Sequence, residues 1–178
     1  MKVFITGSSR GLGEAFVNHY LNEGAEVYGL GRSEVLRSDY RYRQVDVSDS
    51  RLLEKELSQM FETVEKLDLV LLNAGVLGRI QDISLCSTQQ LKKEMDINMW
   101  ANKTILDFFI KKGIRLKQVI AISSGASVNG SLGWNGYSLS KAALNMLIKL
   151  YAAEMQDTHL SSLAPGLIGT EMLEGLLR

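Results

Sequence analysis

The sequence predicts an α/β fold, a doubly wound parallel sheet of about six strands with helices on both faces. Three observations predict it. Short apolar segments alternate with longer segments of helical periodicity, the apolar residues of the short segments run continuously, and a glycine-rich turn joins the first strand to the first helix. A chain of 178 residues, 46% hydrophobic and 22% charged, is expected to form a single domain over residues 1–178.

The elements are expected in a regular order, each from its own local pattern. Gly24 ends the first helix, Ser48 or Asp49 caps the second, and the sequence "NAG" at residues 73–75 stops the fourth strand. Residues 32–46 leave too little chain for a full crossover helix, so an irregular connection is expected there. Strands are predicted at residues 2–6, 25–30, 42–47, 67–72, 117–123 and within 159–166, and helices at 14–24, 48–66, 88–112 and from Tyr137 to about residue 155.

Charge and cysteine content narrow the function classes. Lysine plus arginine equals aspartate plus glutamate at 20 each, so no strong field favours nucleic acid or an anionic membrane as a partner. The single cysteine, Cys86, excludes an internal disulfide and favours a free thiol in a reducing compartment. His19 and His159 have no ligand pattern around them, so no metal site is expected. Without a long apolar segment, we expect a cytoplasmic protein.

The turn "TGSSRGLG", from Thr6 to Gly13, follows a strand and opens a helix. In that context Gly7 permits the sharp turn, Gly11 lets the backbone approach a pyrophosphate, and Gly13 lets the helix pack closely on the sheet. The free amides of the new helix would face the phosphates. The turn therefore predicts a Rossmann-like dinucleotide site; the alternative is a glycine-rich turn without a ligand.

The end of the second strand favours NADP(H) over NAD(H). An acidic residue there would hold the ribose hydroxyls of NAD, but the segment "YGLGRS" has Gly31 and Arg32 instead. Arg10 lies in the glycine-rich turn, and two guanidinium groups near the adenosine ribose suit a 2′-phosphate. The alternative is that both arginines are solvated surface groups.

Tyr137 and Lys141 are four residues apart at the start of a predicted helix, so both can face one cleft. A free phenol has a pKa near ~10, too high for efficient proton transfer near neutrality. A neighbouring ammonium favours the phenolate, so the pKa of Tyr137 is predicted to be lowered. Tyr137 could then give a proton to a carbonyl or take one from an alcohol. The alternative is a surface tyrosine beside a lysine that extends to solvent.

Taken together and in order, these motifs resemble the short-chain dehydrogenase/reductase family, trimmed at the C-terminus. The resemblance runs from residue 2 to about 172 and rests on the spacing TGxxxGxG, "DV" at 46–47, "NAG" at 73–75, Asn98, Ser124, the Tyr137–Lys141 pair and "PGLIGT" at 165–170. Each motif alone is moderately specific, and their order along the chain is very specific.

The resemblance implies a role for each of these residues. Ser124 precedes Tyr137 by 13 positions and would orient the substrate oxygen, although Ser123 is adjacent. Asn98 would hold a water that links Lys141 to solvent, or could be a buried amide satisfied by backbone. The predicted catalytic set is Asn98, Ser124, Tyr137 and Lys141. The predicted cofactor-binding set is Gly7, Ser9, Arg10, Gly11, Leu12, Gly13, Arg32, Asp46, Val47, Asn73, Ala74, Gly75, Tyr137, Lys141, Pro165, Gly166, Ile168 and Thr170.

The chain departs from the family's pattern near its end. It stops eight residues after Thr170, where most relatives continue with lid helices and a seventh strand, so an open substrate side and an exposed sixth strand are expected. The substrate wall is expected among Leu77, Val128, Trp134 and Leu167, which could equally be core or surface residues. Apolar faces on the helices that carry Asn98 and Tyr137 predict a homodimer or higher homo-oligomer, unless both faces simply cover the sheet.

The predicted function is that of an oxidoreductase that transfers a hydride between NADP(H) and a small carbonyl or secondary alcohol, with Tyr137 as general acid or base. The alternative is a catalytically weak NADP(H)-binding regulatory or scaffold protein with the same fold. The intact Ser124, Tyr137 and Lys141 favour the enzyme, because a pure binder needs no proton path.

Overall fold

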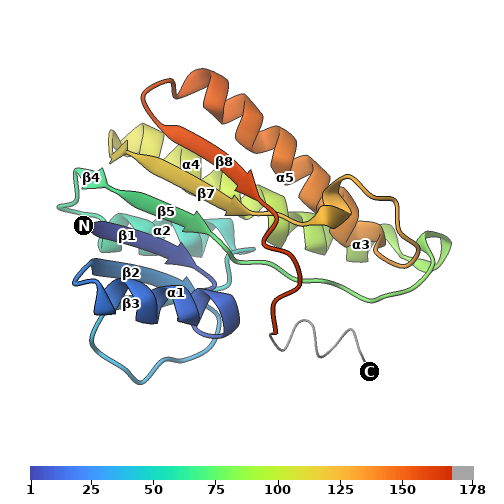
Figure 1. The fold of residues 1–178 in the computed structure, drawn as a ribbon, viewed down its shortest axis with the longest axis horizontal. Helices are drawn as coiled ribbons and strands as arrows, with labels where there is room; N and C mark the ends of the chain where they lie inside the picture. The colour runs from blue at the N-terminus through green and yellow to red at the C-terminus, as the bar shows by residue number, and fades with distance from the viewer. Residues whose placement is uncertain (170–178) are drawn as a thin grey trace.

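A computed structural model of the protein describes residues 1–169 and confirms the predicted fold class (Figure 1). Six parallel strands form one sheet in the order β3-β2-β1-β5-β7-β8. The strands of this sheet are β1 (Lys2–Thr6), β2 (Glu26–Gly31), β3 (Arg41–Gln44), β5 (Leu69–Leu72), β7 (Gln118–Ile122) and β8 (His159–Leu163). A second, two-stranded parallel sheet joins β4 (Lys66–Leu67) to β6 (Arg115–Leu116).

Helices cover both faces of the sheet, as Figure 1 shows. Helix α1 (Gly11–Asn22) lies on one face, and α2 (Ser50–Met60), α4 (Ala101–Lys112) and α5 (Asn135–Glu154) lie on the other. Successive strand residues point to opposite faces, so each buried strand contributes to two cores and reads as a continuous apolar run. In β1, for example, Val3 and Ile5 pack on the α1 side and Phe4 packs on the other.

Local signals place most helix ends as predicted. The Asp49 carboxylate accepts a hydrogen bond from the Leu52 amide at 3.0 Å and caps α2. Ser87 and Gln90 form a capping box at the start of α3 (Thr88–Met95). Gly113 ends α4 in the left-handed conformation, with φ of 74°. Two single-turn 3₁₀ helices, η1 (Ile83–Leu85) and η3 (Gly125–Ser127), complete the helical elements of the described chain.

Four predicted elements differ from the structure. The second helix, expected over residues 48–66, ends at Met60. The single helix expected over residues 88–112 is wrong: a π-helical segment, η2 (Asp96–Trp100), separates α3 from α4. The strand expected over 67–72 divides into β4 and β5. Asp68 separates these two strands, and its carboxylate accepts a hydrogen bond from the Lys2 amide at 2.9 Å. The third strand ends at Gln44 instead of Val47. The irregular connection between β2 and β3 is confirmed, since residues 32–40 contain no helix.

The topology positions a crevice at one edge of the sheet. The chain proceeds from β1 to β2 and β3 on one side, and continues with β5, β7 and β8 on the other, so the order reverses beside β1. In open parallel sheets, ligands bind at such a reversal, beyond the carboxyl ends of the strands. The glycine-rich turn and the start of α5 both lie at that edge (Figure 1). Within residues 1–169, no helix is both long and apolar enough to cross a membrane.

Candidate active site

The glycine-rich turn is anchored to the chain that follows β5. The buried hydroxyl of Thr6 accepts hydrogen bonds from the amides of Asn73 and Ala74, both at 2.9 Å. The side-chain amide of Asn73 donates to the carbonyl oxygens of Thr6 at 3.0 Å and of Gly7 at 3.3 Å. Four hydrogen bonds thus hold the first turn against the "NAG" segment, and the predicted residues Gly7, Asn73 and Ala74 lie together.

Steric room in this turn depends on the absence of side chains at two positions. Gly7 has φ of +67°, and a Cβ there would lie 2.9 Å from Ala74 Cα. A Cβ at Gly13 would lie 2.0 Å from the carbonyl oxygen of Gly7. Only glycine permits this close approach of α1 to the turn. The packing matches the roles that a dinucleotide site requires of its first and third glycines.

The start of α1 leaves its first amides without a side-chain cap. Arg10 is the N-cap residue and its side chain makes no capping hydrogen bond, while Gly11 begins the helix with φ of +56°. Uncapped amides at a helix start, together with the helix dipole, bind anions. The residues present therefore fit a bound pyrophosphate between Ser9 and Gly13.

At the end of β2, two side-chain hydroxyl groups crowd the position of Gly31. A Cβ at Gly31 would lie 2.7 Å from the Tyr42 hydroxyl and 2.8 Å from the Ser9 hydroxyl. The Tyr42 hydroxyl itself donates to the Ser33 carbonyl at 2.5 Å. Arg32 is exposed, and its guanidinium lies near the Asp46 carboxylate. Val47 is buried in the core. The predicted residues Arg32, Asp46 and Val47 thus come from the chain directly after β2 and from the segment after β3.

Tyr137 is the third residue of α5 and is 8% exposed. The Ser124 side chain, shortly beyond β7, is near enough to the Tyr137 phenol to lower its pKa in part. The Lys141 ammonium lies 5.6 Å from the centre of the Tyr137 ring and donates to the Ile122 carbonyl oxygen at 2.7 Å. The structure therefore brings Ser124, Tyr137 and Lys141 together, as the sequence predicts.

The predicted lowering of the Tyr137 pKa is wrong for the described protein. Burial raises the pKa of the phenol, because less water is left to stabilise the phenolate, and the Ser124 side chain opposes this only in part. Lys141 lies beneath the ring, bonded to a backbone carbonyl, and burial lowers its own pKa to about 8. Tyr137 consequently keeps its proton near neutrality.

Asn98 is fully buried in η2 and its side chain is satisfied by protein groups. The side-chain oxygen accepts from the Val76 amide at 2.8 Å, and the side-chain nitrogen donates to the Val76 carbonyl and to the Ser140 hydroxyl, both at 2.9 Å. This is the backbone-satisfied amide that the sequence left open as the alternative. A Cβ at Gly75 would lie 3.3 Å from Asn98 Oδ1 and 3.5 Å from Lys141 Nζ, so these three residues meet.

Sequence reasoning missed two residues that join the predicted ones. The Ser140 hydroxyl donates to the Tyr137 carbonyl at 2.8 Å while it accepts from Asn98, and so links η2 to α5. Thr6 links the first turn to Asn73. Ser140 is three positions after Tyr137 in "YSLSK", and this spacing on one helix face is a signal that could have identified it. Thr6 has no comparable signal, because its partners lie 67 and 68 residues away.

The remaining predicted residues are less enclosed. Pro165 and Gly166 are exposed, Ile168 is half-buried, and Thr170 lies outside the described residues. Of the residues expected to form a substrate wall, Leu77 and Trp134 are half-buried, and the Trp134 ring lies 5.8 Å from that of Tyr137. Val128 and Leu167 are 81% and 83% exposed, so they enclose nothing in the described structure. Over residues 1–169 no cluster of metal-ligand residues occurs.

Comparison with known proteins agrees with the geometry. The family model described as short chain dehydrogenase matches residues 1–178. The benzil reductase ((S)-benzoin forming) of Saccharomyces cerevisiae is 31% identical, over 96% of this chain and 72% of its own. The benzil reductase ((S)-benzoin forming) of Bacillus subtilis is 32% identical, over 94% of this chain and 74% of its own.

Solved structures show the same fold. The crystal structure of the short-chain dehydrogenase/reductase YIR035C from Saccharomyces cerevisiae superposes with a TM-score of 0.87 at 27% identity. The match covers 98% of this chain and 74% of that one. The parallel six-stranded sheet and its helices are therefore those of an established group of proteins.

Proposed function

The chain belongs to the short-chain dehydrogenase family of oxidoreductases, and from this membership we propose that it reduces a carbonyl compound with NADPH, using Tyr137 as the proton donor. The observation that carries the proposal is the pairing of Tyr137 with Ser124. Both residues lie beyond the carboxyl ends of the strands, where the glycine-rich turn also lies, and the Ser124 side chain is close enough to the phenol to act on its pKa. A carbonyl oxygen placed between two hydroxyl groups would accept hydrogen bonds from both as negative charge develops on it.

The cofactor would be held by the glycine-rich turn after β1 and by the start of α1. The amides at the start of α1, between Gly11 and Gly13, would bind the pyrophosphate. When bound, a nicotinamide cofactor supplies the hydride. The protein supplies orientation and the proton.

Reduction requires a protonated Tyr137, although the raised pKa by itself makes the phenol a weaker acid. A phenol that keeps its proton near neutrality is ready to donate it to an oxygen that becomes negative. Lys141, with a pKa of about 8, carries a positive charge at neutral pH directly below the ring. That charge would stabilise the phenolate left after proton transfer. The Ser140 hydroxyl, which is bonded to the Asn98 side chain and to the Tyr137 carbonyl, fixes the turn of α5 that carries Tyr137.

Benzil is the first substrate to test, because two relatives are named as reductases of benzil that form (S)-benzoin. We expect the purified chain to oxidise NADPH when benzil is added, measured as loss of nicotinamide absorbance, with benzoin as the product by chiral chromatography. A panel of aldehydes and simple ketones would define the range. Tight binding of NADPH without turnover of any carbonyl would contradict the proposal and favour the binding-protein alternative.

Arg32 is proposed to select NADPH over NADH. Its exposed guanidinium follows Gly31, a position that the hydroxyl groups of Tyr42 and Ser9 crowd. We expect Arg32→Ala to weaken NADPH binding about tenfold, the loss of one solvent-screened phosphate contact, and to leave NADH binding unchanged. Nucleotide fluorescence titrations measure both constants. Arg41→Ala is the matched control, since Arg41 pairs with Glu26 at the amino ends of β2 and β3, whereas Arg32 follows the carboxyl end of β2. Equal weakening of NADH and NADPH would contradict the role.

We further propose that α4 and α5 form a homodimer interface. Leu139, Met146 and Leu150 share one face of α5 by helical spacing and are each more than half exposed, and Trp100 of η2 is 49% exposed. We expect the chain to be a dimer by light scattering at micromolar concentration. Leu150→Glu should convert it to a monomer, because it buries a charge at the interface centre. Leu36→Glu, in the exposed β2–β3 connection, should leave it dimeric. A monomeric parent chain would overturn this proposal.

A further inference from the structure

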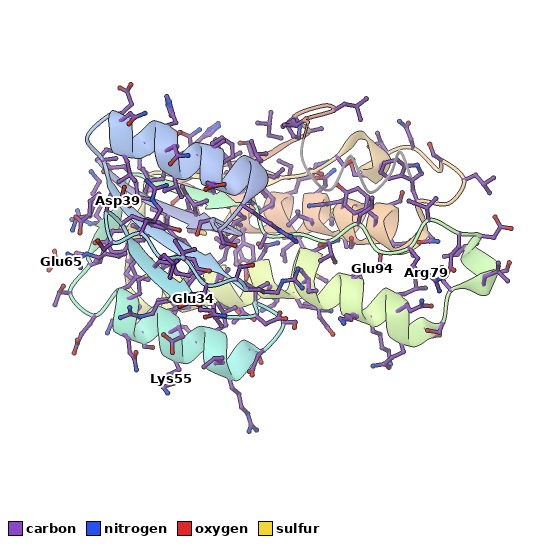
Figure 2. The ribbon with its side chains drawn as sticks, turned by 90° about the horizontal axis from the view of Figure 1, so that it is seen from below. Glu34, Asp39, Lys55, Glu65, Arg79 and Glu94 are labelled. Atoms are coloured by element: carbon purple, nitrogen blue, oxygen red, sulfur yellow. The ribbon has the colours of Figure 1, made fainter. Side chains whose placement is uncertain are left out.

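Glu94 is a buried acidic residue that neither the motifs nor the proposed reaction uses. It lies on α3, where this helix faces α5, and Figure 2 shows it between these two elements. The residue is only 7% exposed. Among the described residues, its Oε2 atom has no hydrogen-bond partner. Such a group is costly to bury, so its retention in the core needs a physical explanation.

Two glycines form the space around the Glu94 carboxyl. A Cβ at Gly78, in the loop after β5, would lie 2.2 Å from Oε1, and this glycine has φ of +75°. A Cβ at Gly136, the second residue of α5, would lie 2.5 Å from Oε2. Each distance is too short for any real contact, so the carboxyl fills the room that two missing side chains leave. The next residue along α5 is Tyr137.

The same loop and the same helix start are joined at two further points. The Asn135 side-chain amide donates to the Gln81 carbonyl at 2.7 Å, and Gly133 packs against Ile80 closely enough that a Cβ would lie 2.8 Å from its methyl group. One turn after Glu94, Asn98 holds Val76 through two hydrogen bonds. Glu94 therefore lies between the part of the loop that Asn98 holds and the part that α5 holds.

We propose that Glu94 is a positioning residue, whose carboxyl is the spacer that holds the loop after β5 against the first turn of α5 and so sets the place of Tyr137. The role as part of a catalytic site rests on the proposed reductase function; the spacer itself is a property of the packing. Burial of the carboxyl raises the pKa of Glu94.

A double-mutant cycle between Glu94 and Gly136 tests the spacer. Gly136→Ala adds a methyl group that collides with Oε2, although alanine otherwise favours a helix. We expect Gly136→Ala and Glu94→Ala each to lower kcat for benzil by about tenfold to a hundredfold, because a displacement near 1 Å has such effects at reacting groups. In the double variant the methyl group occupies vacated space, so its kcat should be no lower than that of either single variant. Glu94→Gln, uncharged and of the same shape, should retain kcat within about threefold.

Two further measurements separate positioning from general damage and from failure of the reductase proposal. The ring signals of Tyr137 in an NMR spectrum, identified by their loss in Tyr137→Phe, should shift in Gly136→Ala and Glu94→Ala and stay in place in Glu94→Gln. This readout needs no turnover. Met60→Ala, in the buried part of α2, should lower Tm without moving those signals or kcat.

The outcomes that overturn the spacer are specific. The spacer role is wrong if the effects of Glu94→Ala and Gly136→Ala on kcat simply add in the double variant, or if Glu94→Gln lowers kcat as much as Glu94→Ala does. It is also wrong if the Tyr137 ring signals do not shift in either alanine variant. Should Glu94→Ala fail to fold, the comparison of Gly136→Ala with Glu94→Gln still decides. If the chain turns over no carbonyl compound but the Tyr137 ring signals shift as expected, the spacer role stands and the reductase function is refuted.

Discussion

Tyr137→Phe is expected to abolish reduction of a carbonyl substrate while leaving NADPH binding intact. The variant removes one hydroxyl from a ring that is 8% exposed, so the packing of α5 should persist. Loss of the general acid should lower kcat by about a hundredfold to ten-thousandfold. Steady-state NADPH oxidation measures the loss, and a fluorescence titration measures the dissociation constant, which should stay within about twofold because the phosphates are held elsewhere.

The matched control for this substitution is Tyr151→Phe on the same helix. Tyr151 is also buried, and its hydroxyl donates to the Asp107 carboxylate at 2.5 Å. It lies far along α5 from Tyr137. Turnover should survive in this variant, even if it unfolds at a lower temperature. A Tyr137→Phe protein that reduces benzil at the parent rate would sink the assignment of Tyr137 as proton donor.

Gly13→Ala is expected to damage both stability and cofactor binding. Its methyl group would lie 2.0 Å from the carbonyl oxygen and 2.8 Å from the carbonyl carbon of Gly7, and these backbone atoms cannot easily move aside. Either α1 moves away from the sheet or the turn between Thr6 and Gly11 opens. We expect a loss of about 1–3 kcal/mol in the free energy of unfolding, the usual cost of overpacking. Binding of NADPH should weaken by more than about tenfold, since the displaced amides no longer point at one site.

Gly130→Ala provides the control, because a Cβ at that position would meet no atom within 4 Å. Urea unfolding monitored by circular dichroism and the same nucleotide titration apply to both variants. If Gly13→Ala bound NADPH as tightly as Gly130→Ala, the turn could not be the pyrophosphate site.

Much of the fold could be predicted from local pattern. Continuous apolar runs, helical periodicity and the short connection after β2 are properties of neighbouring residues, and they indicated a parallel sheet with helices on both faces. The interruption at η2 could not be predicted this way. Asn98 bonds to Val76, 22 residues earlier in the chain, and the widened turn accompanies that contact. No sequence window around Asn98 contains its partner.

The candidate site also has features that local spacing predicted and features that only tertiary packing decided. Spacing alone predicted that Tyr137 and Lys141 share a helix face, and the order of motifs predicted that Ser124 joins them. Spacing could not predict the direction of the Tyr137 pKa, because that direction depends on how much water reaches the phenol and on where the Lys141 amine points. Both are decided by packing against Ile122, Ser124 and Trp134.

By itself the sequence determined the fold class, the glycine-rich turn and the set of polar residues at one sheet edge, because these follow from periodicity, backbone freedom at glycine and strand order. Only the tertiary structure decided which of those residues touch, which keep their protons, and that Glu94 fills the space between Gly78 and Gly136. The physical reason is that burial and contact sum over segments far apart in the chain, whereas local propensity does not.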